Sequence, residues 1–412
     1  MGVCHNYKGV NQKYFLHSFF NKPCHMIKKI LSITLIAVLV ILVLFFSIVP
    51  EYVDRSMNKT IHTVTAADKV SWYDSIPFIA DLHCDALLWD RDLLKHHNYG
   101  AVDIPRMQEA NEAFQVFTIV SKTPRGINYD KNTDKTDQVA LLSFAQLQPV
   151  SDWFSIKARA LHQCERLHKF ATRSNGIFRV ITNQEELRQF IDDRSKNRSL
   201  TSGMLGLEGA HCLENDINNL DTFYKAGVRY IGLTHFFDNE WGASAHGVSK
   251  AGITEKGKEL LKKMEEKHII IDIAHASPKL IDDIFANTTG PLILSHGGTK
   301  GTCDNVRNLS DAQIAEVGKR NGLIGIGMWE KAVCGTNAEA TAKAIKYVAD
   351  KIGVDKVSMG SDFDGAIEAS YDITGFEAVV KALINEGFNR TDIEKIMGGN
   401  VRDFFLHNLP AK

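Results

Sequence analysis

The sequence predicts an α/β fold, a (β/α)8 or TIM-type barrel of parallel strands, preceded by one N-terminal transmembrane helix. Eight short apolar runs alternate with helical stretches over about 330 residues. Several of these runs are continuous, as in strands that are buried on both faces. Six of them end in side chains that can bind a metal or move a proton. The carboxyl ends of barrel strands meet on one face, so these side chains predict a single site.

The first element is an apolar stretch from Ile30 to Val49, which as a helix would span roughly 30 Å, the hydrocarbon thickness of a bilayer. Five lysines and no acidic residue precede it. The positive-inside rule therefore predicts a cytoplasmic segment at 1–29 and a transmembrane signal anchor at 30–49, with the rest of the chain outside the cytoplasm. A cleaved signal peptide is the alternative, but the long basic region and the poor cleavage sites favour an anchor.

The composition indicates a globular region after this helix in the sequence. The 412 residues are 44% hydrophobic and 24% charged, and residues 50–412 carry 43 basic against 49 acidic residues. This mildly acidic charge argues against nucleic acid as a partner. Residues 50–76 are polar and predict a linker with a short helix, and 77–412 predict the barrel domain.

The strands of this domain are predicted at 78–84, 114–120, 204–209, 228–234, 269–274, 291–295, 322–327 and 357–361. The stretch 122–190 is the largest insertion between them. An amphipathic helix is predicted at 254–268, and the Ser310 to Gln313 spacing indicates a capping box. Two closing helices are predicted at 371–390 and 391–406, with Thr391 as N-cap of the second.

Five of the seven cysteines would lie outside the cytoplasm, where disulfides are permitted. Cys303 and Cys334 follow two neighbouring strands and are the favoured pair for a disulfide. No C-x-x-C pair occurs, which argues against a structural zinc ribbon.

Candidate metal ligands stand at several strand ends. His83 and Asp85 are two residues apart and project to the same face of a strand, although this pair alone is weak evidence. Glu208 follows an apolar run, and a buried glutamate needs either an ion pair or a metal. His275 and His296 each end an apolar strand. One such histidine is usually a core residue, whereas three histidines with two carboxylates suit zinc.

Five ligands are more than one tetrahedral zinc needs. They fit two ions about 3.5–4 Å apart that share a carboxylate and a bridging hydroxide. Asp362, in the run GSDFDG, is a candidate proton carrier beside such a pair. The alternative is that Asp362 belongs to an ordinary loop turn, a pattern that the pair Asp364 and Gly365 also matches.

Taken together, the motifs resemble the membrane dipeptidase (renal dipeptidase) family, peptidase family M19. The resemblance runs in order from about residue 77 to 406 and rests on DLHCD, GLEGAH, LTHFFDNEWGAS, GITEKGKELL, IIDIAHAS, LSHGG, VRNLSD, GSDFDG and MGGNVRDFF. It implies a zinc metallopeptidase, a barrel of the metal-dependent hydrolase kind with two Zn²⁺ ions, that cleaves dipeptides with a metal-bridging hydroxide. Family members are commonly dimers, so a homodimer is implied too.

The resemblance also implies a role for each site residue. His83 and Asp85 would bind one zinc, His275 and His296 the other, and Glu208 would bridge them. His235 would bind the oxyanion of the tetrahedral intermediate or help to place the substrate. Asp362 would take a proton from the attacking water and pass it to the leaving amine. Arg307 would grip the terminal carboxylate of the substrate in bidentate fashion.

The sequence departs from the family at three places. Trp329 stands where the family often has a tyrosine-bearing loop, and Trp89 is displaced from an early family tryptophan, which leaves the side-chain preference open. The N-terminal helix replaces the lipid anchor of animal members. This favours a bacterial inner-membrane protein that faces the periplasm, with a eukaryotic type II arrangement as the alternative.

Two other functions remain open at this stage. A related barrel amidohydrolase acting on another amide or a lactam would share the metals but would not need Arg307. A membrane-tethered binding protein would keep the barrel and lose ligands, whereas the full ligand set is present here.

Overall fold

The structure, a computed structural model, describes residues 13–61 and 65–412, and residues 1–12 and 62–64 lie outside the description. The predicted basic segment 1–29 and the predicted linker 50–76 therefore fall partly outside the described residues. The chain divides into two compact units, 1–49 and 50–412.

A long helix, α1 (Lys13–Met57), contains the apolar stretch predicted to cross a membrane. The part from Met26 to Met57 is long and apolar enough for such a span, and its most apolar 18-residue window has a mean hydropathy of 3.1 and no buried residue. A signal sequence near an N-terminus has the same properties. The helix does not stop at Val49, and its residues after that point belong to the second unit.

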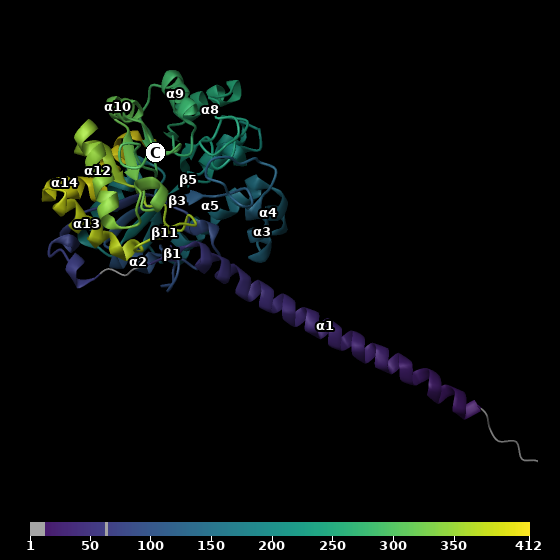
Figure 1. The fold of residues 1–412 in the computed structure, drawn as a ribbon. Coiled ribbons are helices and arrows are strands. Elements are labelled where there is room, and N and C mark those ends of the chain that lie inside the picture. Colours follow the sequence, from purple (N-terminus) through teal and green to yellow (C-terminus); the bar gives the residue numbers. More distant parts are fainter. Residues whose placement is uncertain (1–12, 62–64) are drawn as a thin grey trace, which may run out of the picture. The chain divides into compact units, whose positions relative to one another are not determined.

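The second unit is a barrel. Within the described residues, eight parallel strands pair in the order β3-β2-β10-β9-β8-β7-β6-β5, and a β3–β5 pairing closes the ring. Helices lie around these strands (Figure 1). The eight predicted strands are confirmed with small shifts at their ends, as β2 (Ile79–Cys84), β3 (Glu112–Ile119), β5 (Thr201–Leu207), β6 (Val228–Gly232), β7 (Ile270–Asp272), β8 (Leu292–Leu294), β9 (Leu323–Ile326) and β10 (Val357–Met359).

The insertion at 122–190 contributes a strand that the sequence did not predict. β4 (Phe178–Val180) pairs with the first residues of β5, outside the closed ring. The helices of this region are α3 (Gln138–Ala145), α4 (Val150–Phe154), α5 (Ile156–Arg173) and α6 (Gln184–Lys196). A second small parallel pair joins β1 (Lys59–Thr60) to β11 (Glu368–Ala369).

The other helices follow the strands. The predicted capping box is present: the Ser310 side chain accepts from the backbone N–H of Gln313, and the Gln313 side chain accepts from the backbone N–H of Ser310. In the last predicted helix the N-cap is Asn389 rather than Thr391. The Asn389 side chain accepts from the backbone N–H of Asp392, so the helix starts earlier. These helices are α2 (Ile104–Glu109), α7 (Asn219–Lys225), α8 (Glu255–Glu266), α9 (Pro278–Asn287), α10 (Asp311–Lys319), α11 (Glu330–Val333), α12 (Ala338–Ile352), α13 (Phe376–Asn385), α14 (Arg390–Glu394) and α15 (Asn400–Asn408).

The interior of the barrel is packed with side chains. Leu82, Val116 and Met204, on three of the strands, belong to one apolar cluster with Phe404 and Phe405 of α15. A second, larger cluster packs the strands against the surrounding helices. Because the interior is filled, chemistry is expected at the carboxyl ends of the strands.

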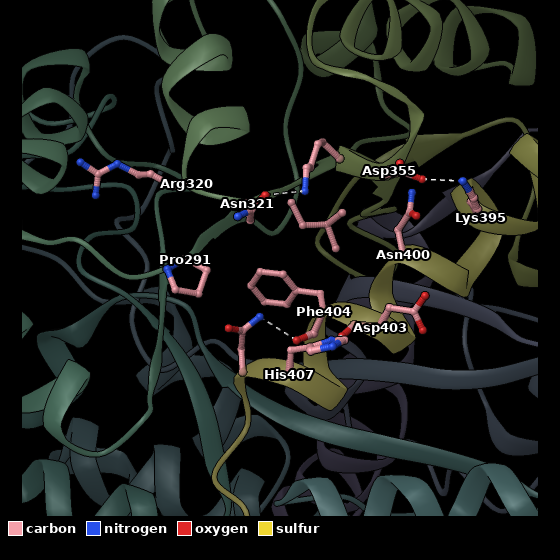
Figure 2. A pocket seen from close by; sticks show the side chains of 13 residues that line it. Pro291, Arg320, Asn321, Asp355, Lys395, Asn400, Asp403, Phe404 and His407 are labelled. Carbon is pink, nitrogen blue, oxygen red and sulfur yellow. Dashed lines mark hydrogen bonds and ion pairs between the residues drawn. The ribbon is translucent and has the colours of Figure 1, made fainter.

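A surface pocket of about 510 Å³ lies beside α15 (Figure 2). Leu323, the first residue of β9, and Pro291, just before β8, help to line it, so it lies at the amino-terminal ends of these strands. In a parallel barrel this is the face opposite the carboxyl ends.

Candidate metal centre

The six predicted site positions on strand ends come together on one face. Seven side chains lie at or just after the carboxyl ends of six strands: His83 and Asp85 at β2, Glu208 at β5, His235 at β6, His275 at β7, His296 at β8 and Asp362 at β10. All of these side chains are buried. Residues up to 279 positions apart in the sequence thus form one cluster.

Glu208 is at the centre of the cluster. Its Oε1 lies 2.8 Å from His275 Nε2, 3.3 Å from His296 Nε2 and 3.5 Å from His83 Nε2. Its Oε2 lies 3.3 Å from His235 Nε2. Four imidazoles therefore point their outer nitrogen atoms at one carboxylate.

The possible ligand sets overlap. Three groups have ligand atoms that all lie within 4.8 Å of one another: His83–Glu208–His296, Glu208–His235–His275 and His83–Asp85–Asp362. The five predicted ligands all occur in these groups. His235 and Asp362, for which other roles are predicted, are within the same reach.

The protonation tendencies of the cluster fit a cation. Burial opposes a charge on His83, but the carboxylates of Glu208 and Asp85 raise its pKa to about 9. Burial raises the pKa of Glu208 well above its usual value, and Asp85 adds to this. Burial also lowers the pKa values of His275 and His296 well below normal, and the nearby positive charge of Arg307 adds to this effect at both. The lowered pKa values favour neutral His275 and His296, the form in which imidazole binds metal.

Two buried polar atoms support the same conclusion. His83 Nε2 and Glu208 Oε2 make no hydrogen bond, although both are buried in the middle of the cluster. Unpaired buried polar atoms are costly, and a cation between these lone pairs would satisfy them. The residues present therefore fit a divalent metal.

A serine and an aspartate orient the ligand histidines. Ser295 Oγ lies 2.9 Å from His296 Nδ1 and 3.3 Å from His83 Nδ1. The same hydroxyl donates to Asp272 Oδ2 at 2.6 Å, and the backbone N–H of Ser295 donates to Asp272 Oδ1 at 2.9 Å. Such outer partners set the ring orientation of ligating histidines. The sequence did not name them; the signal available was an aspartate inside an apolar run, IIIDIAH.

A matching pair holds the opposite side of the cluster. Asp81 accepts from the backbone N–H of Ser361 at 2.7 Å and from its hydroxyl at 2.5 Å. The Ser361 hydroxyl also donates to the His83 carbonyl at 3.1 Å. Thr118 of β3 donates to the carboxylate of Asp85. The strand ends that carry Asp85 and Asp362 are thus tied to their neighbours.

Two of the site residues have strained backbones. His275 has φ 58° and Asp362 has φ 64°, in the left-handed region that non-glycine residues rarely adopt. Strain of this kind gathers at functional sites, where the surrounding structure enforces it. The pKa of Asp362 is raised to about 7, mainly by burial, with the charge of His83 lowering it and that of Asp85 raising it. A carboxyl group with a pKa near neutrality can both accept and release a proton.

Arg307 lies over the histidines from the loop that follows β8. Its Nη1 is 3.4 Å from His275 Nδ1, and its Nη2 donates to the His296 carbonyl at 3.3 Å. The guanidinium also stacks on Trp329, with 5.2 Å to the ring centroid. Arg307 is buried, and no carboxylate of the described residues pairs with it. It is therefore suited to an anionic group of a ligand.

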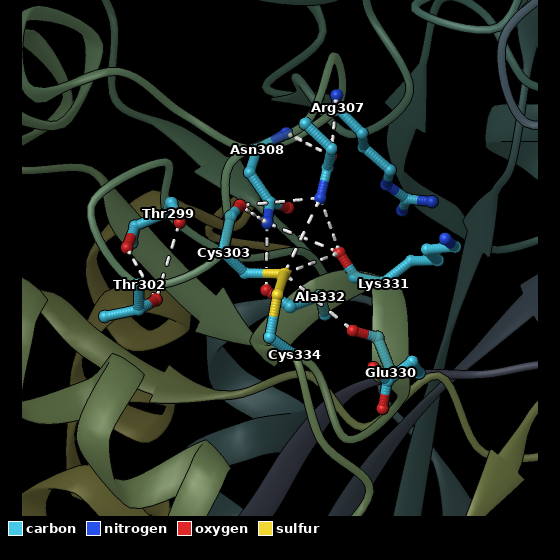
Figure 3. Close-up of a disulfide and its surroundings, with 10 residues drawn as sticks. Thr299, Thr302, Cys303, Arg307, Asn308, Glu330, Lys331, Ala332 and Cys334 are labelled. Atoms are coloured by element: carbon cyan, nitrogen blue, oxygen red, sulfur yellow. Dashed lines mark hydrogen bonds between the residues drawn. A yellow bond between two sulfur atoms is a disulfide. The ribbon is translucent and has the colours of Figure 1, made fainter.

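The predicted disulfide is confirmed and braces this loop. Cys303 and Cys334 are bonded across 31 positions (Figure 3). Asn308 donates to the carbonyls of Cys303 at 2.7 Å and Ala332 at 2.9 Å. The loop that carries Arg307 is thereby fastened to the segment that follows Trp329.

Two residues near the cluster were not singled out from the sequence. The His246 ring lies 5.3 Å from the His275 ring, and its Nδ1 is 2.5 Å from the Tyr129 carbonyl oxygen. Burial lowers the pKa of His246 to about 3, with Arg307 adding to the effect. Tyr129 comes from the 122–190 insertion, whose position relative to the barrel no local pattern reveals.

Comparisons with known proteins find similar dipeptidases. A profile of the membrane dipeptidase family, peptidase family M19, matches residues 74–404. Dipeptidase tcpJ of Claviceps purpurea is 24% identical over 73% of this chain and 68% of its own. Dipeptidase aclJ of Aspergillus oryzae is 24% identical over 78% and 76%.

Solved structures show the same fold. Dipeptidase AC, described as a metallopeptidase of family M19, has a TM-score of 0.66 and 24% identity, covering 81% of this chain and 99% of its own. A metallopeptidase from Rhodobacter sphaeroides, liganded with a phosphinate mimic of the dipeptide L-Ala-D-Ala, has a TM-score of 0.64 and 23% identity, with the same coverage.

Proposed function

Because the chain belongs to the membrane dipeptidase family, peptidase family M19, we propose that it is a dipeptidase with two zinc ions, anchored to a membrane by α1. The observation that supports this most strongly is the convergence of four imidazoles on Glu208, with Asp85 and Asp362 beside them. His83 and Asp85 would hold one ion, His275 and His296 the other, and Glu208 both.

When bound, the ions would polarise the scissile carbonyl and lower the pKa of a water molecule. The protein side chains supply the remaining steps. Arg307 pairs with the free carboxylate of the dipeptide and so sets how far the dipeptide enters the site. His235, whose pKa burial lowers well below normal, is neutral and donates a hydrogen bond to the developing oxyanion. Asp362 takes the proton of the attacking water and passes it to the leaving amine.

A metal assay tests the first part of this proposal. Purified full-length protein is expected to contain close to two zinc ions per chain, and removal with EDTA is expected to abolish dipeptide hydrolysis. Zinc added back should restore activity, because the ligands come from rigid strand ends. Full activity of the metal-free protein would contradict the proposal, and one ion per chain would contradict the paired site.

Arg307 distinguishes a dipeptidase from an amidohydrolase with another amide substrate. We expect Arg307→Ala to lower kcat/KM for a free dipeptide by about 100-fold, since a charged partner is lost. The C-terminal amide of the same dipeptide should be a poor substrate for both proteins. Arg307→Lys is the matched control, which keeps the charge and loses the bidentate grip. Equal cleavage of acid and amide by the unmodified protein would favour the amidohydrolase.

We place the barrel outside the cytoplasm. The Cys303–Cys334 disulfide supports this, because such bonds persist in oxidising compartments. The apolar part of α1 would be the anchor, with the lysines that precede it on the cytoplasmic side. A periplasmic site in a bacterium and a homodimer stay predictions from the sequence.

A further inference from the structure

The segment that follows the apolar span is part of the barrel unit. The sequence predicts a linker there, but Asp54, in the last turns of α1, is 2% exposed. Its carboxylate forms an ion pair with Arg91, with 2.9 Å between Oδ2 and Nε. Its Oδ1 accepts from the Asn58 side chain at 2.8 Å. A buried ion pair of this kind does not belong to a flexible tether.

Arg91 connects this segment to the loop that follows β10. Its Nη2 lies 2.8 Å from Asp364 Oδ2, so one guanidinium pairs with two carboxylates. The Asp364 carboxylate also accepts from the backbone N–H groups of Ala101 at 2.7 Å and Val102 at 3.1 Å. A Cβ on Gly100 would come within 2.1 Å of Arg91 Nη1, so glycine is needed for this approach.

Asn58 and the backbone after it hold the next part of the same loop. Asn58 Oδ1 accepts from the backbone N–H of Ala366 at 2.9 Å. Lys59 N–H donates to the Ile367 carbonyl at 3.0 Å, and Ile61 N–H to the Ala369 carbonyl at 2.9 Å. Strand β1 thus runs parallel to β11 and fixes its register.

The loop held in this way has an unfavourable backbone. Asp362, Asp364 and Ala366 have φ values of 64°, 62° and 60°, all left-handed. Such a conformation persists only where the surroundings impose it. Gly365 lies against the Asp362 side chain, since a Cβ there would be 2.3 Å from Asp362 Oδ1. A shift of residues 364–366 would therefore move the Asp362 carboxylate.

We propose that Asp54 and Asn58 are positioning residues, which hold the loop at 362–366 so that Asp362 reaches the substrate. This inference rests on the proposed function for the role of Asp362, but the contacts themselves do not. It follows that the chain just after the anchor contributes to catalysis as well as to attachment. Separation of residues 50–61 from the barrel should lower turnover even where the barrel stays folded.

Kinetics of the full chain test this role. Asn58→Ala and Asp54→Asn are expected to lower kcat about tenfold, with KM and zinc content unchanged, because a small misplacement of a proton carrier slows chemistry without weakening binding. The matched controls are Lys59→Ala, which loses only an exposed contact with Glu368 at 4.0 Å, and Glu51→Gln, which loses an exposed contact with Arg55. Both controls should keep the activity of the unmodified protein.

Amide hydrogen exchange provides a readout that does not depend on activity. In Asn58→Ala, a peptide covering 362–369 should exchange faster than in the unmodified protein, while the peptides of β2 and β8 should not change. A normal kcat in both variants, or a fall in kcat without faster exchange at 362–369, would overturn the proposal. If the unmodified protein cleaves no dipeptide, the proposed function fails, and the exchange rates alone still decide whether Asn58 holds the loop.

Discussion

Glu208→Gln is expected to abolish dipeptide hydrolysis, by at least about 1,000-fold in kcat/KM, and to empty both metal positions. One carboxylate is within 3.5 Å of four histidine nitrogens, so both ions depend on the same pair of oxygen atoms. Glutamine has one acceptor oxygen, and its NH₂ group donates hydrogen bonds where a cation needs a lone pair.

The measurement is zinc per chain together with turnover. Glu112→Gln is the matched control, since Glu112 is equally buried, at the start of β3 on the far side of the barrel. Burial raises the pKa of Glu112 well above its usual value, which favours the protonated carboxyl group that an amide resembles. This control should keep both metal and activity. Glu208→Gln with full zinc and normal turnover would refute the bridging role.

Asp362→Asn is expected to keep both zinc ions and to lower kcat by about 1,000-fold, within the range for loss of general acid–base catalysis. KM should change little, because Arg307 and the metals hold the substrate. Asp355→Asn is the control, because Asp355 forms an exposed contact with Lys395 away from the site. Substantial loss of zinc from Asp362→Asn would instead make Asp362 a ligand, as its place beside His83 and Asp85 allows.

The pH profile gives a second check on Asp362. As a base it must be ionised, so kcat should fall as the pH drops through its pKa. That pKa is about 7 without metal, and bound cations should lower it by favouring the carboxylate. The acidic limb is therefore expected below about pH 7, and it should disappear in Asp362→Asn.

Much of the fold could be read from local patterns. The eight strands were found because each is a continuous apolar run, and a strand buried on both faces needs such a run. The capping box of α10 was visible because its partners are three residues apart. The candidate ligands were recognised because polar side chains at the ends of apolar runs are unusual and parallel strands gather their ends.

Other features were missed because they depend on contacts between distant segments. β4 was missed because Arg179 interrupts its three residues, so no continuous apolar run marks this strand. Asp272 was not linked to Ser295, because only the pairing of β7 with β8 brings them together. Residues 50–61 read as a linker because they are polar, and polarity does not show that Asp54 will meet Arg91.

The sequence by itself determined the type of barrel, the set of side chains that can bind metal and the family of the chain, because short-range spacing and residue chemistry carry that information. Only the tertiary structure decided that four histidines surround Glu208 and that the segment after α1 supports the loop of Asp362. The pairing of β2 with β10 brings residues 91 and 364 together, and the pairing of β1 with β11 brings the end of α1 to them, so no local pattern encodes these contacts.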